Sequence, residues 1–160
     1  MTGSWAGAMG QTQFMPSSYM NYAVDFDGDG HRDIWKSDAD ALASIANYLT
    51  QFGWNGDQTW GREVRVTPAL LERINADVPK RAMGCSAIRN MTERRPLQEW
   101  SALGVTRADG GPLPKSSINA GLVDVGDRKF LVYPNYDAIL GYNCAHYYAL
   151  TVALLGDALR

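Results

Sequence analysis

The segment of residues 38–52 carries apolar side chains at the spacing of a single helix face. Ser37 or Asp38 is a suitable N-terminal cap, and Gly53 is a natural stop. We therefore predict a helix that runs from about residue 38 to Gly53 and buries one face. The positions that define this face are Leu42, Ile45, Ala46, Leu49 and Phe52.

Residues 62–132 have a different pattern, in which short apolar segments are separated by turn residues. Three of these segments, residues 63–66, 122–125 and 129–133, read as strands, the first by its alternation of polar and apolar residues. We therefore predict a small β-rich lobe over this region. Its other expected elements are short helices over residues 68–76 and 96–103 and turns at residues 109–112 and 126–127.

The last segment, residues 142–159, is apolar on most faces and predicts a buried helix whose partner is the helix of residues 38–52. Together these elements indicate an α+β fold that is mainly helical. The expected division is into residues 1–62, residues 63–132 and residues 133–160.

Composition narrows the class of protein. The 160 residues are 46% hydrophobic and 20% charged, which predicts a packed globule, and the net charge is only −2. Basic residues form no run or stripe, which argues against a nucleic-acid partner held through phosphates. Five Trp and eight Tyr suit stacking on sugar rings, although aromatic side chains more often fill cores.

Cys85 and Cys144 are the two cysteines, and neither stands in a metal-binding spacing. They either pair in an oxidising compartment or remain as two free, buried thiols. The sequence alone says nothing about their distance, so both alternatives stay open.

Residues 25–33 (DFDGDGHRD) match the start of an EF-hand calcium loop. Aspartates stand at positions 1, 3 and 5, a glycine at position 6 and a further aspartate at position 9. Carboxylates packed this closely repel one another unless a cation neutralises them. We therefore predict a Ca²⁺ site with Asp25, Asp27 and Asp29 as ligands; the alternative is a turn that binds no ion.

The remaining calcium ligands depart from the EF-hand pattern. His31 stands at position 7, where the ligand is a backbone carbonyl, so its ring is not needed. Lys36 stands at position 12 in place of the bidentate glutamate. The closing carboxylate must therefore come from the next helix, and we expect Asp40 to supply it, with Asp38 as the alternative.

Three blocks of sequence carry a resemblance to a known family. They are GSWAGAMGQTQFMPSSY from residue 3, YAVDFDGDGHRDIW from residue 22 and DALASIANYL from residue 40. In this order they resemble the lytic murein transglycosylase B family. The family's later hallmark follows as residues 133–136 (YPNY), Tyr142-Asn143 and residues 147–150 (YYAL), whereas residues 63–130 match only loosely.

The resemblance implies a lysozyme-like core with a structural calcium loop and a small β-rich lobe. Such enzymes act on peptidoglycan glycan strands in the periplasm, in some cases anchored to the outer membrane. They cleave the bond between N-acetylmuramic acid and N-acetylglucosamine and leave a 1,6-anhydro ring on the muramoyl product. A single glutamate serves as acid and then as base, whereas most glycosidases use two carboxylates.

The resemblance places that glutamate in a Glu-Thr-x-x-Gly helix N-terminal to the Gly-Ser-Trp-Ala-Gly block. This sequence contains no such motif, so we expect the chain to start in mid-domain, with the catalytic glutamate upstream of Met1. No catalytic residue is assigned within the chain. Its four glutamates, expected to be solvated surface charges, are Glu63, Glu72, Glu93 and Glu99.

The family's glycan-binding positions do match residues of this sequence. Tyrosines stack on pyranose rings, while glutamine and asparagine amides hydrogen-bond N-acetyl groups. For Tyr48 and Tyr148, core packing is an equally good interpretation. The expected substrate-binding residues are Ser4, Gln13, Phe14, Tyr48, Tyr142, Asn143 and Tyr148.

Two other classes of function compete with the catalytic one. A chain without a catalytic acid is equally suited to be a calcium-stabilised module that binds peptidoglycan without cleaving it. A dockerin-like calcium module is disfavoured, because dockerins carry their Asp/Gly loop twice and here it occurs once. We also expect self-association, since a core without its first helices would expose apolar surface.

Overall fold

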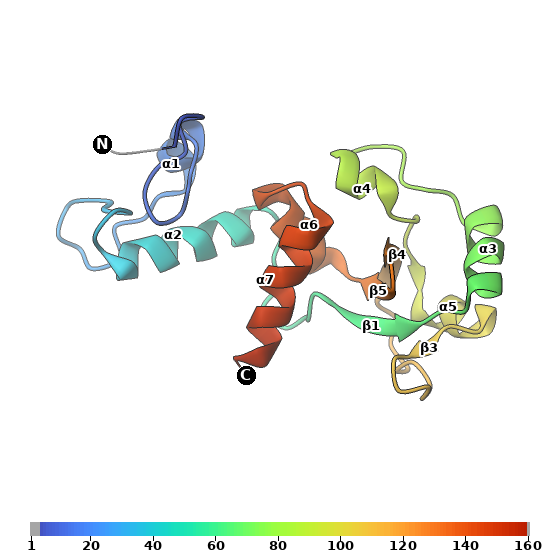
Figure 1. Ribbon diagram of the computed structural model, residues 1–160. Coiled ribbons are helices and arrows are strands. Elements are labelled where there is room, and N and C mark those ends of the chain that lie inside the picture. Colours follow the sequence, from blue (N-terminus) through green and yellow to red (C-terminus); the bar gives the residue numbers. More distant parts are fainter. Residues whose placement is uncertain (1–3, 160) are drawn as a thin grey trace. The chain divides into compact units, whose positions relative to one another are not determined.

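The computed structural model describes residues 4–159, which form two compact units, Met1–Trp54 and Asn55–Arg160 (Figure 1). The division into residues 1–62, 63–132 and 133–160 stays a prediction.

The first unit contains two helices, α1 (Pro16–Tyr22) and α2 (Asp38–Gln51). Helix α2 begins as predicted, because the Ser37 hydroxyl accepts a hydrogen bond from the backbone N–H of Asp40 at 3.2 Å. It ends before Gly53, whose φ of 88° is a conformation that glycine adopts without strain.

The predicted buried face of α2 is wrong. Leu42 is 68% exposed, and the buried residues are instead Asp40, Ala41, Ser44 and Tyr48. The reason is that two polar side chains on this face satisfy backbone N–H groups of the preceding loop. Ser44, for example, accepts a hydrogen bond from the N–H of Val24 at 2.9 Å.

The second unit is built on a five-stranded antiparallel sheet with the order β2-β4-β5-β1-β3. Strands β4 and β5 form a hairpin through Gly126 and Asp127, as predicted. The strand bounds are β1 Gly61–Arg65, β2 Arg95–Pro96, β3 Thr106–Arg107, β4 Asn119–Val125 and β5 Arg128–Val132. The predicted β-rich lobe is confirmed in its strands.

Three short helices belong to the same region: α3 (Pro68–Asp77), α4 (Ser86–Asn90) and α5 (Leu97–Leu103). Helices α3 and α5 confirm the prediction, and Gly104, with a φ of 104°, ends α5. Trp100 on α5 is fully buried, and its Nε1 donates a hydrogen bond to the carbonyl of Ala120 at 2.9 Å. Apolar residues of α3, α5 and the sheet thus form one core.

The opposite face of the sheet carries an aromatic layer. The Trp60 ring lies 6.0 Å from that of Phe130 and 6.2 Å from that of Tyr136, measured between centroids. The Trp60 Nε1 donates to the Asp157 carboxylate at 2.8 Å. This bond ties the end of the last helix to the start of β1.

The predicted helix of residues 142–159 corresponds to α7 (His146–Ala158), whereas the helix before it, α6 (Pro134–Tyr142), was not predicted. Helix α7 buries Ala149, Leu150 and Ala153 but leaves Leu155 58% exposed, so the prediction of burial on most faces is wrong. Its expected packing on residues 38–52 stays a prediction, because the two segments belong to different units.

Within residues 4–159, no single helix is long and apolar enough to cross a membrane. Taken together, α6 and α7 pass that test, by length and composition alone. The pair is bent, with 117° between the two helices.

Candidate functional site

The segment that precedes α1 forms a tight loop. Met9 and Phe14 pair as an isolated antiparallel bridge, and the Ser4 hydroxyl accepts a hydrogen bond from the N–H of Ala8 at 3.1 Å. Gly10 lets the loop lie close to Ile34, because a Cβ there would lie 2.7 Å from that residue. At this position the small residue serves close packing.

Gln13, at the turn of this loop, is the one non-glycine residue with positive φ (51°) in the described part of the chain. Its side chain is exposed, and its Nε2 donates to the carbonyl of Gly10 at 2.8 Å. A left-handed backbone costs most residues about 1 kcal/mol or more, and such strain concentrates at functional positions. The conformation is therefore consistent with a binding role.

Phe14 and Tyr48 are brought together, with ring centroids 5.7 Å apart. Tyr48 also stacks on Phe52 at 4.3 Å and meets the edge of Tyr22 at 4.9 Å. Phe14 is 2% exposed and Tyr48 6% exposed. Within this unit they belong to a buried aromatic cluster, whereas the side chains of Ser4 and Gln13 are exposed.

The Asp/Gly loop gathers three carboxylates. Ligand atoms of Asp25, Asp27 and Asp29 all lie within 4.8 Å of one another, and the last two side chains are exposed. Asp25 shapes the turn, accepting hydrogen bonds from the N–H groups of Gly28 at 2.7 Å and Gly30 at 2.9 Å. A set of carboxylate oxygens around a tight turn fits a hard cation such as Ca²⁺.

The later candidate ligands lie on the helix side of the loop. Asp40 is buried, and its carboxylate accepts hydrogen bonds from the N–H groups of Phe26 and Asp33, each at 2.8 Å. The bond from Phe26 is the main cause that lowers the pKa of Asp40. The alternative ligand, Asp38, accepts a hydrogen bond from the Gln11 amide at 3.0 Å.

His31 contributes to the loop through its backbone. Its N–H donates to the Asp29 carboxylate at 2.8 Å, and its side chain is exposed. This arrangement leaves the ring outside the carboxylate cluster, in line with the role expected from the EF-hand pattern.

Three candidate residues belong to the second unit. The rings of Tyr142 and Tyr148 are stacked with centroids 6.4 Å apart, at the end of α6 and the start of α7. Asn143 is the C-terminal cap of α6 and directly follows Tyr142 in the sequence. Its side chain is exposed. Burial raises the pKa of Tyr148, so its hydroxyl stays a neutral hydrogen-bonding group.

None of the four glutamates has the environment of a catalytic acid. Glu63 forms a two-point ion pair with Arg128, at 2.9 and 2.6 Å, and a hydrogen bond from this guanidinium lowers the pKa of Glu63. A proton-donating glutamate needs the opposite shift. Glu99 pairs with Arg95 at 3.5 Å, and the remaining two, Glu72 and Glu93, are exposed.

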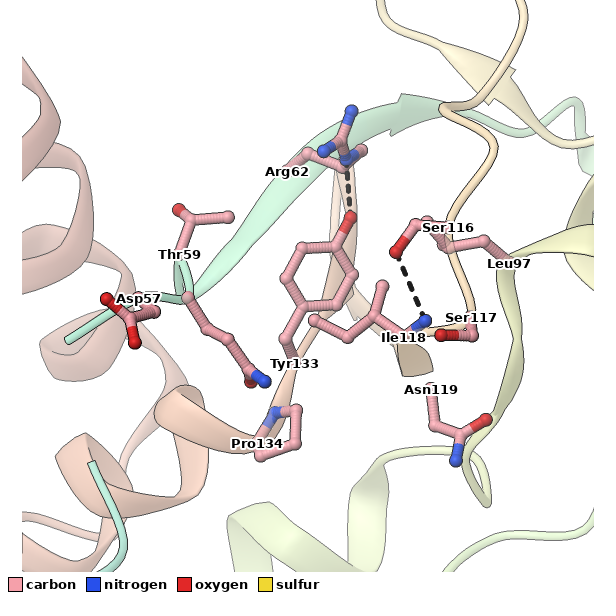
Figure 2. Close-up of a pocket in the computed structure, with 11 residues that line it drawn as sticks. Asp57, Thr59, Arg62, Leu97, Ser116, Ser117, Ile118, Asn119, Tyr133 and Pro134 are labelled. Carbon is pink, nitrogen blue, oxygen red and sulfur yellow. Dashed lines mark hydrogen bonds between the residues drawn. The ribbon is translucent and has the colours of Figure 1, made fainter. Parts of the chain in front are cut away.

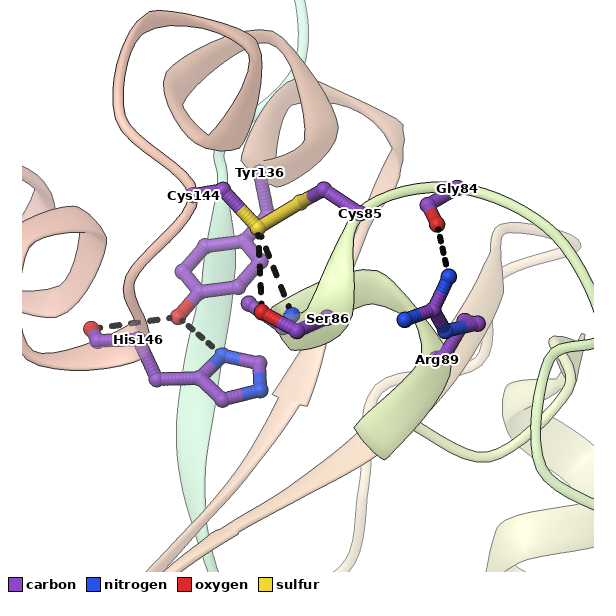
Figure 3. The surroundings of a disulfide bond; sticks show 8 residues. Gly84, Cys85, Ser86, Arg89, Tyr136, Cys144 and His146 are labelled. Carbon is purple, nitrogen blue, oxygen red and sulfur yellow. Dashed lines mark hydrogen bonds between the residues drawn. A yellow bond between two sulfur atoms is a disulfide. The ribbon is translucent and has the colours of Figure 1, made fainter.

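The structure decides the alternative that the cysteines left open. Cys85 and Cys144 form a disulfide that ties α4 to the segment between α6 and α7 (Figure 3). The Cys144 sulfur also accepts a hydrogen bond from the N–H of Ala87 at 3.3 Å. Nearby, His146 Nδ1 lies 3.1 Å from the Tyr136 hydroxyl, and burial lowers the pKa of His146.

A pocket of about 520 Å³ lies wholly within the second unit (Figure 2). Its walls come from residues 57–59 and 116–119, with Arg62 on β1 and Tyr133-Pro134 beyond β5. Sequence analysis missed it, because its residues come from distant segments, and only Tyr133-Pro134 belongs to a recognised block. The Arg62 Nε donates to the Tyr133 hydroxyl at 2.5 Å across the strands.

The chain matches the solved structures of lytic transglycosylases. Residues 1–157 match the family model of the transglycosylase SLT domain, and the chain belongs to this family. The resemblance to lytic murein transglycosylases is thereby confirmed, and the fold is the lysozyme-like lytic transglycosylase fold with helices and a curled antiparallel sheet.

Individual relatives agree with this assignment. The chain is 36% identical over 160 residues to membrane-bound lytic murein transglycosylase B of Escherichia coli strain K12, covering 99% of this chain and 40% of the relative. SltB3 of Pseudomonas aeruginosa, solved with NAG-NAM-pentapeptide, is 47% identical, with a TM-score of 0.83. The match covers 99% of this chain and 40% of SltB3. The Escherichia coli enzyme Slt35, solved with calcium, is 33% identical, with a TM-score of 0.73. The match covers 99% of this chain and 46% of Slt35.

The chain therefore spans about two fifths of the length of the relatives it matches. The activity, substrates and partners of a whole protein of this family are proposals for this chain.

Proposed function

We propose that this chain is part of a lytic transglycosylase that cleaves the β-1,4 bond between N-acetylmuramic acid and N-acetylglucosamine in peptidoglycan and leaves a 1,6-anhydromuramoyl product. The observation that carries the proposal is the family match over residues 1–157. SltB3, which is 47% identical, was solved with NAG-NAM-pentapeptide, a peptidoglycan fragment. The same membership supports a periplasmic location, with or without a membrane anchor.

In this proposal, each unit offers its own candidate glycan contacts. In the first unit, Ser4 and Gln13 offer exposed polar groups, while the rings of Phe14 and Tyr48 are buried. In the second unit, Asn143 offers an exposed amide next to Tyr142, whose ring stacks on that of Tyr148. Amides suit N-acetyl groups, and aromatic faces suit pyranose rings.

Calcium in this proposal stabilises the Asp/Gly loop. Asp25, Asp27 and Asp29 hold the ion with their carboxylates and His31 with its carbonyl. Asp40 closes the site from α2, and its carboxylate also orders the loop through the N–H of Phe26. Slt35, a relative at 33% identity, was solved in complex with calcium.

The catalytic acid in this proposal lies outside these 160 residues. The support is the environment of the four glutamates, which are ion-paired or exposed rather than desolvated in a site. The same observation favours a second candidate function for the chain by itself. Alone, it would bind peptidoglycan as a calcium-stabilised module and not cleave it.

Mass spectrometry of peptidoglycan incubated with the purified chain and calcium separates these functions. We expect no 1,6-anhydromuramoyl products but sedimentation of the chain with the sacculus. Anhydro products from the chain alone would place the acid within it, and Glu63→Gln, Glu72→Gln, Glu93→Gln and Glu99→Gln variants would then identify the residue. Failure to sediment would contradict the glycan-binding role.

Self-association of the isolated chain is also proposed. Helix α7 exposes Leu155, at 58%, and the half-exposed Val152, and Leu159, which follows the helix, is 80% exposed. Exposed apolar side chains at this spacing favour association in water. Light scattering should show dimers or larger species, and a monodisperse monomer would contradict this.

A further inference from the structure

The pocket beside Arg62 contains none of the residues assigned to glycan or calcium. It lies within the second unit, and its volume of about 520 Å³ is in the range of small-molecule sites. Most of its lining side chains are polar, so it is not a defect of the apolar core. Its polar lining is suited to a polar ligand.

Arg62 is the distinctive group of this pocket. It is one of four partly buried arginines in the described part of the second unit, and the only one that forms no ion pair there. The other three are paired: Arg81 and Arg94 with Asp137, and Arg95 with Glu99. A partly buried guanidinium without a carboxylate is a ready site for one, because its fork of N–H donors matches two carboxylate oxygens.

Tyr133 holds this guanidinium in place. Tyr133 is 1% exposed, and its hydroxyl accepts the hydrogen bond from Arg62 Nε at 2.5 Å, so one edge of the guanidinium is occupied. Figure 2 shows the Tyr133 ring in the middle of the lining residues, with its hydroxyl toward Arg62. The bond uses Nε only, which leaves the terminal nitrogens for a ligand.

The rest of the lining favours a peptide over a sugar. Ser117, Asn119 and Gln58 offer hydroxyl and amide groups that pair with peptide amides, and Asp57 offers a carboxylate for an ammonium group. A sugar ring would need an open aromatic face, but the Tyr133 ring, which is the aromatic side chain of this pocket, is buried.

We propose that this pocket binds a free carboxylate of the peptide stem carried by peptidoglycan, through Arg62, and so distinguishes peptide-bearing from peptide-free glycan. The inference rests on the proposed function for its source of ligand, since a peptidoglycan strand brings glycan and peptide together.

Calorimetric titration of the chain with a synthetic, N-acetylated pentapeptide stem tests the pocket without any sugar. Arg62→Gln should weaken binding about tenfold or more, because a charge-assisted hydrogen-bond pair is lost. Arg65→Gln is the matched control on the same strand; Arg65 is exposed and outside the pocket, so binding should be unchanged. Amidation of the peptide carboxyl groups should weaken binding to the unaltered chain by a similar factor but cause no further loss with Arg62→Gln.

A second variant guards against a simple loss of folding. Arg62→Gln removes a hydrogen bond to a buried tyrosine, whereas Ser117→Trp fills the pocket from an exposed position and leaves that bond intact. Ser117→Trp should also abolish peptide binding while keeping the melting temperature. Equal binding by Arg62→Gln and the unaltered chain, or an equal loss with Arg65→Gln, would overturn the proposal.

Titration with peptide-free glycan separates this inference from the proposed function. Retained glycan binding without peptide binding would overturn the pocket assignment alone. Peptide binding without glycan binding would support the pocket and count against the glycan role.

Discussion

Cys85 and Cys144 are joined by a disulfide, with Cα atoms 6.2 Å apart, although 59 positions separate them in the sequence. The bond closes a loop that contains α4, α5, α6 and the strands β2 to β5. By restricting the unfolded chain, a loop of this length contributes about 4 kcal/mol to stability in the chain-entropy model. The paired cysteines agree with the oxidising compartment that a periplasmic location would provide.

Loss of the disulfide should therefore destabilise the second unit strongly. Cys85→Ser with Cys144→Ser should lower the free energy of unfolding by about 4 kcal/mol in urea titrations. Reductant should destabilise the unaltered chain by a similar amount and leave the double variant unaffected. A reductant effect on the double variant would show that something other than this bond responds.

Calcium should stabilise the first unit. In a metal-stripped sample, Ca²⁺ at one hundred times its dissociation constant should raise the free energy of unfolding by about 2.7 kcal/mol, because the folded loop alone gathers the carboxylates. Thermal melts should show the shift in the unaltered chain and not in Asp27→Asn with Asp29→Asn. Asp127→Asn, an exposed aspartate in the β4–β5 turn, is the control and should keep the shift. No shift in the unaltered chain would refute the ion site.

Gln13 should show a trade-off between stability and binding. Gln13→Gly relieves the positive φ of 51° and should leave the free energy of unfolding unchanged or raise it by up to about 1 kcal/mol. It should weaken sedimentation with peptidoglycan, since the amide is lost. Gln13→Asn keeps an amide on a residue that tolerates this backbone, and should retain more binding. A stabilised Gln13→Gly with full binding would remove Gln13 from the site.

His146 should make stability depend on pH. Burial lowers the pKa of His146 in the folded chain, so the unfolded chain binds this proton first as the pH falls. Stability from this group is complete above its unfolded pKa of about 6.5 and is lost as the pH falls from there through the folded value. Urea titrations at several pH values should show this loss, and His146→Gln should remove it. His31→Gln alters the other histidine, which is exposed, and should leave the loss in place.

Local signals predicted most of the elements. The cap at Ser37, the stop at Gly104 and the Gly126-Asp127 turn act within a few residues, and each lies where the sequence indicated. The clustering of Asp25, Asp27 and Asp29 is likewise a consequence of spacing within one short loop.

Burial was harder to predict than helix formation. The apolar stripe of α2 indicated a face that contains Leu42, but the buried face carries Asp40 and Ser44. Backbone N–H groups of the preceding loop need acceptors, and these two side chains supply them from α2. Hydrophobic periodicity alone does not indicate which side chains must accept hydrogen bonds from a neighbouring loop.

By itself, the sequence determined the helices, the hairpin, the acidic loop and, through its motifs, the family. Each of these depends on residues close together in the chain or on blocks of matching sequence. Only the tertiary structure decided that Cys85 pairs with Cys144 and that Arg62 meets Tyr133 across 71 positions. These relationships depend on which distant segments the sheet and helices bring together, and no local spacing specifies that distance.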